Sequence, residues 1–90
     1  MRVTIYFCKY SEYETVFSRH FITGITTCNE IGSIPLSELK DILSNSDVEA
    51  LVKRRELIVT RSDTLIKILE KTHTLISKLS GNEYIIVKLT

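Results

Sequence analysis

The stretch RVTIYFCK, residues 2–9, decides the fold class of this chain. Its side chains alternate between the two faces of an extended backbone, Val3, Ile5 and Phe7 on one and Thr4, Tyr6 and Cys8 on the other. Both faces are at least half apolar, which is typical of a strand inside a sheet, covered on one side and partly covered on the other. We therefore predict a strand at the start of the chain.

Two more strands follow from the pattern of apolar residues. Residues 84–89, YIIVKL, alternate like the first stretch and predict the last strand. Residues 57–60, LIVT, form a continuous apolar run between helical segments, which indicates a buried strand. A rival interpretation joins residues 57–60 and 64–69 as a hairpin around residues 61–63.

Three helices are expected between these strands. Pro35 opens the first, since a proline lacks an N–H that the first helical turn leaves unpaired anyway; its apolar stripe is Leu36, Leu39, Ile42 and Leu43. The second begins with a capping box at residues 46–49 and continues to about Arg55. The third and longest begins at residues 62–63 and ends at Gly81, with a core stripe made by Leu65, Ile68, Leu69, Ile76 and Leu79.

Residues 11–24 have two interpretations. Ser11 and Glu14 form a capping box, and apolar side chains recur at helical spacing up to Gly24, which would close a helix. Against this, the segment is rich in threonine, valine and phenylalanine, which favour strands. We favour the helix, followed by a short strand near residues 25–31.

This order of elements predicts an α/β (α+β) fold over residues 1–90 as a single small domain. We expect a mixed β-sheet of about three to five strands with helices packed mainly on one face. A small sheet of this kind has free edges, and a free edge is a ready surface for dimerisation.

The composition limits the cell compartments and the kinds of partner that we expect for this chain. Twelve basic and eleven acidic side chains give a net charge of +1, which favours neither nucleic acid nor an anionic membrane. No apolar run approaches the roughly 20 residues of a membrane span, and the N-terminus alternates where a signal peptide would be continuously apolar. We expect a cytoplasmic protein with no membrane contact. Twelve isoleucines against a single alanine are typical of AT-rich genomes, among them those of many viruses and mobile elements.

The two cysteines, Cys8 and Cys28, are expected to be reduced, because secreted domains of this size usually carry more of them. The histidines, His20 and His73, lie in different predicted elements and share no metal-ligand spacing with the cysteines. No phosphate-binding loop or nucleophile motif is present. We predict no metal, cofactor or small-molecule ligand and no enzymatic activity; a Cys28–histidine catalytic pair is the weakest of the hypotheses considered.

One concentration of charge stands out, at Lys53, Arg54, Arg55 and Arg61. The two short helices before Arg55 have the outline of a helix-turn-helix, so these residues are candidate phosphate ligands. However, cations at a helix C-terminus are also stabilised by the helix dipole alone.

Tyr10 and Tyr13 are candidate interface residues, because tyrosine buries area while keeping a polar end. The sequence therefore predicts a non-enzymatic binding or regulatory module that acts through protein–protein contacts and self-associates as a homodimer. The alternative is a small DNA- or RNA-binding regulator that uses the basic helix end.

Overall fold

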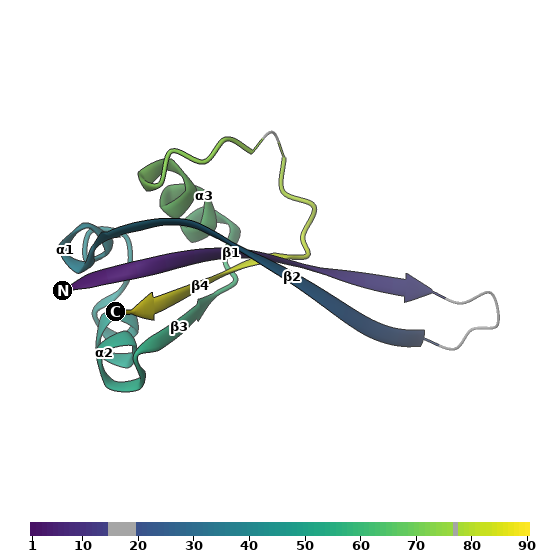
Figure 1. Ribbon diagram of the computed structural model, residues 1–90, viewed down its shortest axis with the longest axis horizontal. Helices are drawn as coiled ribbons and strands as arrows, with labels where there is room; N and C mark the ends of the chain where they lie inside the picture. The colour runs from purple at the N-terminus through teal and green to yellow at the C-terminus, as the bar shows by residue number, and fades with distance from the viewer. Residues whose placement is uncertain (15–19, 77) are drawn as a thin grey trace.

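The strands at the two ends of the chain lie side by side at the centre of one sheet (Figure 1). A computed structural model describes residues 1–14, 20–76 and 78–90, and of residues 11–14 and 20–25 it describes only the backbone. The four strands are β1 (Arg2–Glu14), β2 (His20–Pro35), β3 (Glu56–Val59) and β4 (Glu83–Leu89). Their order across the sheet is β2-β1-β4-β3, and each neighbouring pair is antiparallel.

The register of these strands sorts their side chains between two faces. Val3 lies opposite Ile34 of β2 and Leu89 of β4, and Ile5 lies opposite Val87. All five are buried in the hydrophobic core, where Val3 and Ile5 have no exposed surface. One face of the sheet is therefore continuous with the core.

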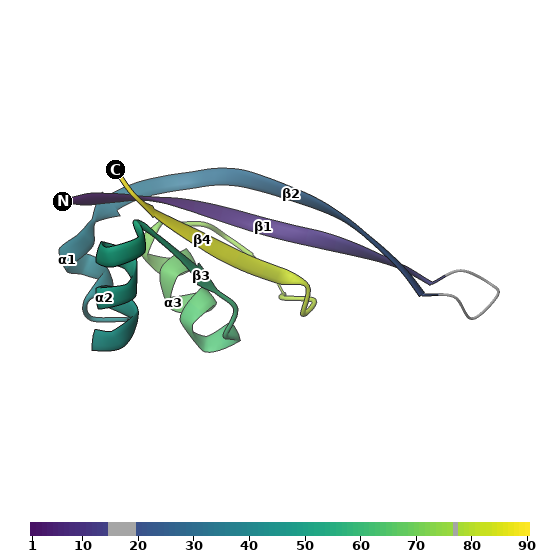
Figure 2. The same ribbon diagram turned by 90° about the horizontal axis from the view of Figure 1, so that it is seen from below.

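Three helices cover that face, and within residues 1–14, 20–76 and 78–90 nothing forms a second layer on the opposite one (Figure 2). They are α1 (Leu36–Leu39), α2 (Asn45–Arg54) and α3 (Ser62–Lys71). Leu39, Leu51 and Ile68 are their fully buried contacts with the sheet. Burying one such side chain contributes about 1.5–3 kcal/mol, so the helix layer depends on a few residues.

The predicted fold class is confirmed: an α+β fold with a four-stranded sheet and helices packed against it. The predicted strands at residues 2–9, 57–60 and 84–89 correspond to β1, β3 and β4. The expectation that residues 57–60 form a buried strand is wrong, because β3 is at the edge of the sheet and Ile58 is 60% exposed. The strand near residues 25–31 is part of β2. The pairing is antiparallel throughout, whereas the sequence suggested a mixed sheet.

The predicted helix over residues 11–24 is wrong where the structure describes it. β1 continues to Glu14 and β2 begins at His20, with Tyr13 opposite Phe21 and Ser11 opposite Ile25. A hairpin pairing between the two ends of this stretch has replaced the capping box, because two strands rich in β-branched and aromatic residues satisfy each other's backbone groups. Residues 15–19 lie outside the described residues.

The helices are shorter than the apolar stripes indicated. The side chain that caps α2 is Ser44, whose hydroxyl accepts a hydrogen bond from the N–H of Asp47 at 3.2 Å.

α3 ends at Lys71 and not near Gly81. The hydroxyl of Thr72 donates to main-chain carbonyls of α3, and His73 has a left-handed φ of 56°. These two residues stop the helix before its apolar stripe ends, and α3 itself rules out the hairpin interpretation of residues 57–69.

A disulfide joins Cys8 to Cys28, so the prediction of two reduced cysteines is wrong. The two residues lie directly opposite each other on β1 and β2, with their Cα atoms 4.1 Å apart. The error came from counting cysteines, because their number does not show that β2 brings Cys28 into register with Cys8. The argument for a reducing compartment from free thiols loses its basis.

We expect reduction of this disulfide to lower the free energy of unfolding by about 3 kcal/mol, from the chain entropy of the loop that it closes. The two cysteines are 20 residues apart in sequence. Urea unfolding of the oxidised protein and of the same protein in excess dithiothreitol measures the difference. A thiol count of zero in the oxidised sample is the control, and equal midpoints for the two samples would contradict the expectation.

A tight turn before β4 holds the carboxylate of Glu83. The backbone N–H of Ser80 lies 2.9 Å from one carboxylate oxygen, and that of Gly81 lies 2.9 Å from the other. Gly81 has a φ of 95°, which a side chain would strain. The Ser80 backbone N–H is the largest cause that lowers the pKa of the Glu83 carboxyl from its ordinary value, ahead of the Ser80 hydroxyl and the Gly81 N–H.

Because folding lowers the pKa of Glu83, its ionised form stabilises the fold above the ordinary pKa of 4.5, and this contribution is lost as the pH falls. We expect Glu83→Gln to lower the melting temperature at about pH 7 but not at about pH 3. Thermal unfolding followed by circular dichroism checks this. Glu70→Gln, at an exposed position on α3, is the control, and the same deficit for Glu83→Gln at both pH values would contradict the assignment.

Candidate functional site

The face of the sheet opposite the helices carries the most distinctive group of side chains (Figure 2). Alternation along the paired strands places them there: residues with even numbers from Arg2 to Tyr10 on β1, and on β3 and β4, point away from the core. We define the open face by the large side chains among them: Tyr6, Tyr10, Ile58, Tyr84 and Ile86. Ile58 is 60% exposed, and the other four are half-buried.

These side chains form cross-strand rows. Tyr6, Ile86 and Ile58 occupy one row across β1, β4 and β3. In the direction of the strands, the rings of Tyr10 and Tyr84 have centroids 6.4 Å apart and planes inclined at 41°. This separation is in the range of favourable aromatic pairs. The open face is therefore a continuous aromatic and aliphatic surface, with tyrosine hydroxyls as its polar groups.

The disulfide lies within this surface. Cys8 lies in register between Cys28 on β2 and Tyr84 on β4, and it has no exposed surface, whereas Cys28 is exposed. A covalent bond between β1 and β2 holds the two strands together below the tyrosines. The disulfide limits the movement of β1 and β2 relative to each other. The open face is therefore ordered before it binds, and less conformational entropy is lost on binding.

The charges around the open face are balanced. The Nζ atom of Lys88 lies 5.5 Å from the centroid of the Tyr6 ring, within the range of a cation–π contact. Glu56 is the cross-strand partner of Lys88, and Glu30 is the cross-strand partner of Tyr6. Arg2, which also has an even number on β1, lies at the end of this face and donates to Ser33 of β2. Two cations and two carboxylates make a mixed rim without a strong field of either sign.

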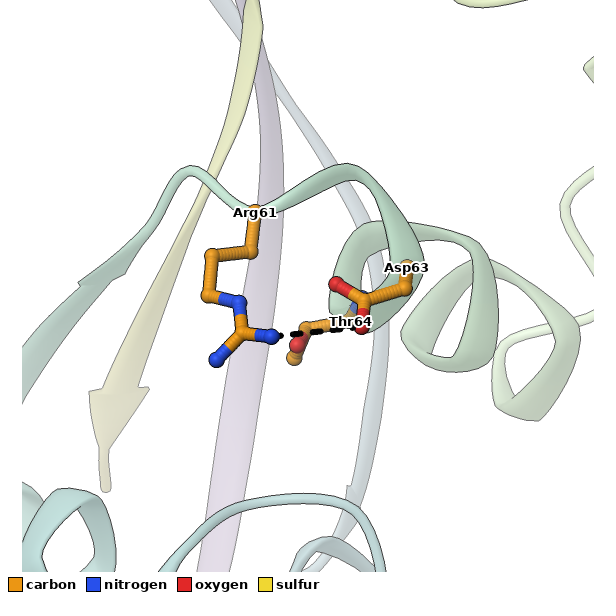
Figure 3. A network of polar contacts seen from close by, with 3 residues as sticks. All are labelled: Arg61, Asp63 and Thr64. Atoms are coloured by element: carbon orange, nitrogen blue, oxygen red, sulfur yellow. Dashed lines mark hydrogen bonds and ion pairs between the residues drawn. The ribbon is translucent and has the colours of Figure 1, made fainter.

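The structure separates the four basic residues that the sequence grouped. Lys53 and Arg54 are in the last turn of α2, and Arg55 follows in a left-handed conformation with a φ of 65°. Arg61 lies beyond the other end of β3. Its guanidinium lies 3.5 Å from the carboxylate of Asp63, which also accepts a hydrogen bond from the N–H of Thr64 at 2.9 Å (Figure 3).

The helix-turn-helix outline is not formed in this segment. α1 has four residues, about one turn, and α2 packs against β3 and β4. The basic residues of α2 stand at its C-terminal end, where the helix dipole stabilises them without a partner. They are exposed, and among the described residues the Arg61–Asp63 pair is the single ion pair.

The two predicted interface tyrosines have different outcomes. Tyr10 is on the open face, in contact with the ring of Tyr84. The backbone of Tyr13 pairs with that of Phe21, but its side chain lies outside the described residues. Sequence reasoning missed the rest of the open face, although the alternation that places Tyr6 and Tyr84 opposite the core was already visible in both end strands.

The catalytic pair considered from the sequence has no free thiol, because the Sγ of Cys28 is bonded to Cys8. His73 is exposed in the turn after α3, and His20 begins β2 opposite Glu14. Within residues 1–14, 20–76 and 78–90, no three side chains of His, Cys, Asp or Glu gather as metal ligands would. None of the helices in that part of the chain has the length and apolar character that crossing a membrane requires.

Comparisons with protein-family models, with curated proteins and with solved structures find no match for this chain.

Proposed function

We propose that this protein is a non-enzymatic binding module that self-associates through the open face. The observation that carries the proposal is that Tyr6, Tyr10, Tyr84, Ile58 and Ile86 form one surface with no second layer over it. Contiguous apolar and aromatic surface on a soluble protein marks an interaction site, because leaving it in water forgoes the free energy of burial.

The charge pattern favours a second copy of the chain as the partner. A two-fold dimer brings the same surface together with itself, so a strongly charged face would repel its own copy. The rim of the open face has carboxylates at Glu30 and Glu56 and an ammonium group at Lys88, which can pair between copies. Tyrosine hydroxyls remain able to hydrogen-bond across such an interface.

The size of the open face indicates a weak and reversible dimer. Four strands spaced about 4.8 Å apart, over the seven residues of β4, cover roughly 450 Å² of sheet. A stable interface buries about 800 Å² on each partner. We therefore expect a dissociation constant in the micromolar range or higher, as is usual for a regulated assembly.

Tyr6→Lys should abolish this self-association, because it places an ammonium group in the centre of the buried surface. Sedimentation equilibrium at rising concentration measures the weight-average mass. We expect the wild type to rise from the monomer mass of 10.3 kDa toward twice that value and Tyr6→Lys to remain at the monomer mass.

Ile66→Lys is the matched control, since Ile66 is 47% exposed on α3, on the helix side of the sheet. It should associate like the wild type, provided that circular dichroism shows both variants folded. A wild type that stays monomeric at the highest concentration would contradict the proposal, as would equal loss of association in both variants.

Single-stranded nucleic acid is the alternative partner, favoured by one feature of the open face. Tyrosines on a sheet, with Lys88 beside Tyr6, resemble the stacking platforms that hold unpaired bases. The carboxylates of Glu30 and Glu56 oppose it, because they border the same rings and repel phosphates. The basic residues 53–55 are at the C-terminal end of α2, where the chain enters β3.

We therefore expect no salt-dependent binding of labelled single-stranded RNA or duplex DNA, measured by fluorescence anisotropy at about 50 and 200 mM salt. Two variants would assign any binding that is found. Loss in Tyr84→Ala would place single-stranded RNA on the open face, and loss in the triple alanine variant of Lys53, Arg54 and Arg55 would place DNA or RNA at the helix end. Either result would replace protein self-association as the leading function.

A further inference from the structure

The outer edge of β3 is unpaired among the described residues. β3 pairs with β4 on one side, and no strand lies on the other. The N–H of Leu89 donates to the carbonyl of Arg55, so these two residues form a hydrogen-bonded pair of the ladder. In an antiparallel ladder such pairs recur at every second residue, so Leu57 and Val59 also direct their backbone groups at β4. The N–H and C=O of Glu56 and Ile58 therefore point outward.

This edge has space beside it for another strand. A hollow of about 310 Å³ is lined by Ala50 and Arg54 of α2 together with residues 56–58 of β3. A second hollow, of about 220 Å³, is lined by Leu43, Asp47 and Thr64 together with residues 57–61. Side chains alternate along a strand, so an added strand would direct every second one toward these hollows.

The charge at the two ends of the edge is unequal. At the start of β3 stand the exposed side chains of Lys53, Arg54 and Arg55, and the one carboxylate of the strand, Glu56, is opposite Lys88. At the far end the charge of Arg61 is offset by Asp63. The edge therefore offers backbone hydrogen bonds along its length and a surplus of positive charge at its beginning.

We propose that the edge of β3 binds an extended segment of a partner protein as a fifth strand, antiparallel to β3, with acidic residues at the segment's C-terminal end. Antiparallel addition continues the pattern of the sheet and places that C-terminal end beside Lys53, Arg54 and Arg55. A second copy of β3 fits poorly. The strand has one carboxylate, Glu56, which is opposite Lys88, so a second copy brings no acidic group for residues 53–55. In the register centred on Ile58, Arg55 of one copy also lies opposite Arg61 of the other, and like charges directly opposite are destabilising.

Two peptides of identical composition test the direction and the charge together. Each is a strand of about six residues that alternates valine and threonine. One carries aspartates at its C-terminal end and the other at its N-terminal end. Fluorescence polarisation should show the first bound at least about fivefold more tightly at low salt, and the triple alanine variant of Lys53, Arg54 and Arg55 should remove that preference.

Substitutions at Ile58 test the strand pairing itself. Ile58→Pro removes an N–H that points outward, so the ladder with β4 keeps its bonds, and proline is tolerated on an edge strand. We expect it to weaken binding of the C-terminally acidic peptide about tenfold or more. Ile58→Ala keeps the N–H but loses a side chain that would contact its cross-strand neighbour on the added strand, so it should weaken binding only about two- to fivefold, less than Ile58→Pro does.

Equal affinity for the two peptides would show that charge attracts them without fixing the direction in which they bind. That result would overturn the proposal. Full binding by Ile58→Pro, or no binding of either peptide, would also overturn it. The experiments are repeated in the Tyr6→Lys variant, so that the result for the edge does not depend on self-association through the open face.

Discussion

The position of β1 between β2 and β4 is the constraint on which the rest of the structure depends. Between Val3 and Tyr10, β1 is hydrogen-bonded on both sides, and this fixes the directions of its side chains there. Val3 and Ile5 face the helices and have no exposed surface, whereas Tyr6 and Tyr10 face the opposite way. The same alternation is transmitted through the register to β4 and β3. One strand therefore decides which residues make the core and which make the open face.

The helices cannot cover both faces of such a sheet. α1 has four residues and α2 and α3 have ten each, and all three pack on the core side. A chain of 90 residues buries a limited share of its surface, so one face of the sheet remains a single layer. The Cys8–Cys28 disulfide compensates in part, because it ties β1 to β2 on the side that has no helices. The described helices and strands are too few and too short to cover this face of the sheet and the edge of β3 as well.

The sequence predicts those parts of the fold whose signal is long or repeated. The end strands alternate clearly, and β3 is a continuous apolar run, so all three were predicted. Residues 11–24 carry both a capping box and strand-forming residues, and the pattern alone does not show whether residues 11–14 form a helical turn or pair with residues 20–25. The disulfide was not predicted because the sequence alone does not show that Cys8 and Cys28 lie opposite each other on paired strands. α3 ended early because the Thr72 hydroxyl and the left-handed backbone of His73 outweigh the apolar stripe that continues after them.

The candidate surfaces were only partly visible for a similar reason. Alternation shows that two faces differ, but it does not say which face the helices will cover, so Tyr6 and Tyr84 were not singled out. Tyr10 was named for its residue type and not for its place. The basic residues 53–55 and Arg61 appear as one cluster in the sequence, yet β3 lies between them. Their new role in the proposed strand addition depends on that separation.

The central claim, that the open face is a self-complementary surface, is tested most directly by NMR chemical shifts over a range of protein concentrations. The account predicts concentration-dependent shifts at Tyr6, Tyr84 and Ile86, with fast exchange as expected for a weak dimer, and unchanged shifts over α1 and α3. Shifts that do not change with concentration, or changes confined to the helix layer, would contradict it.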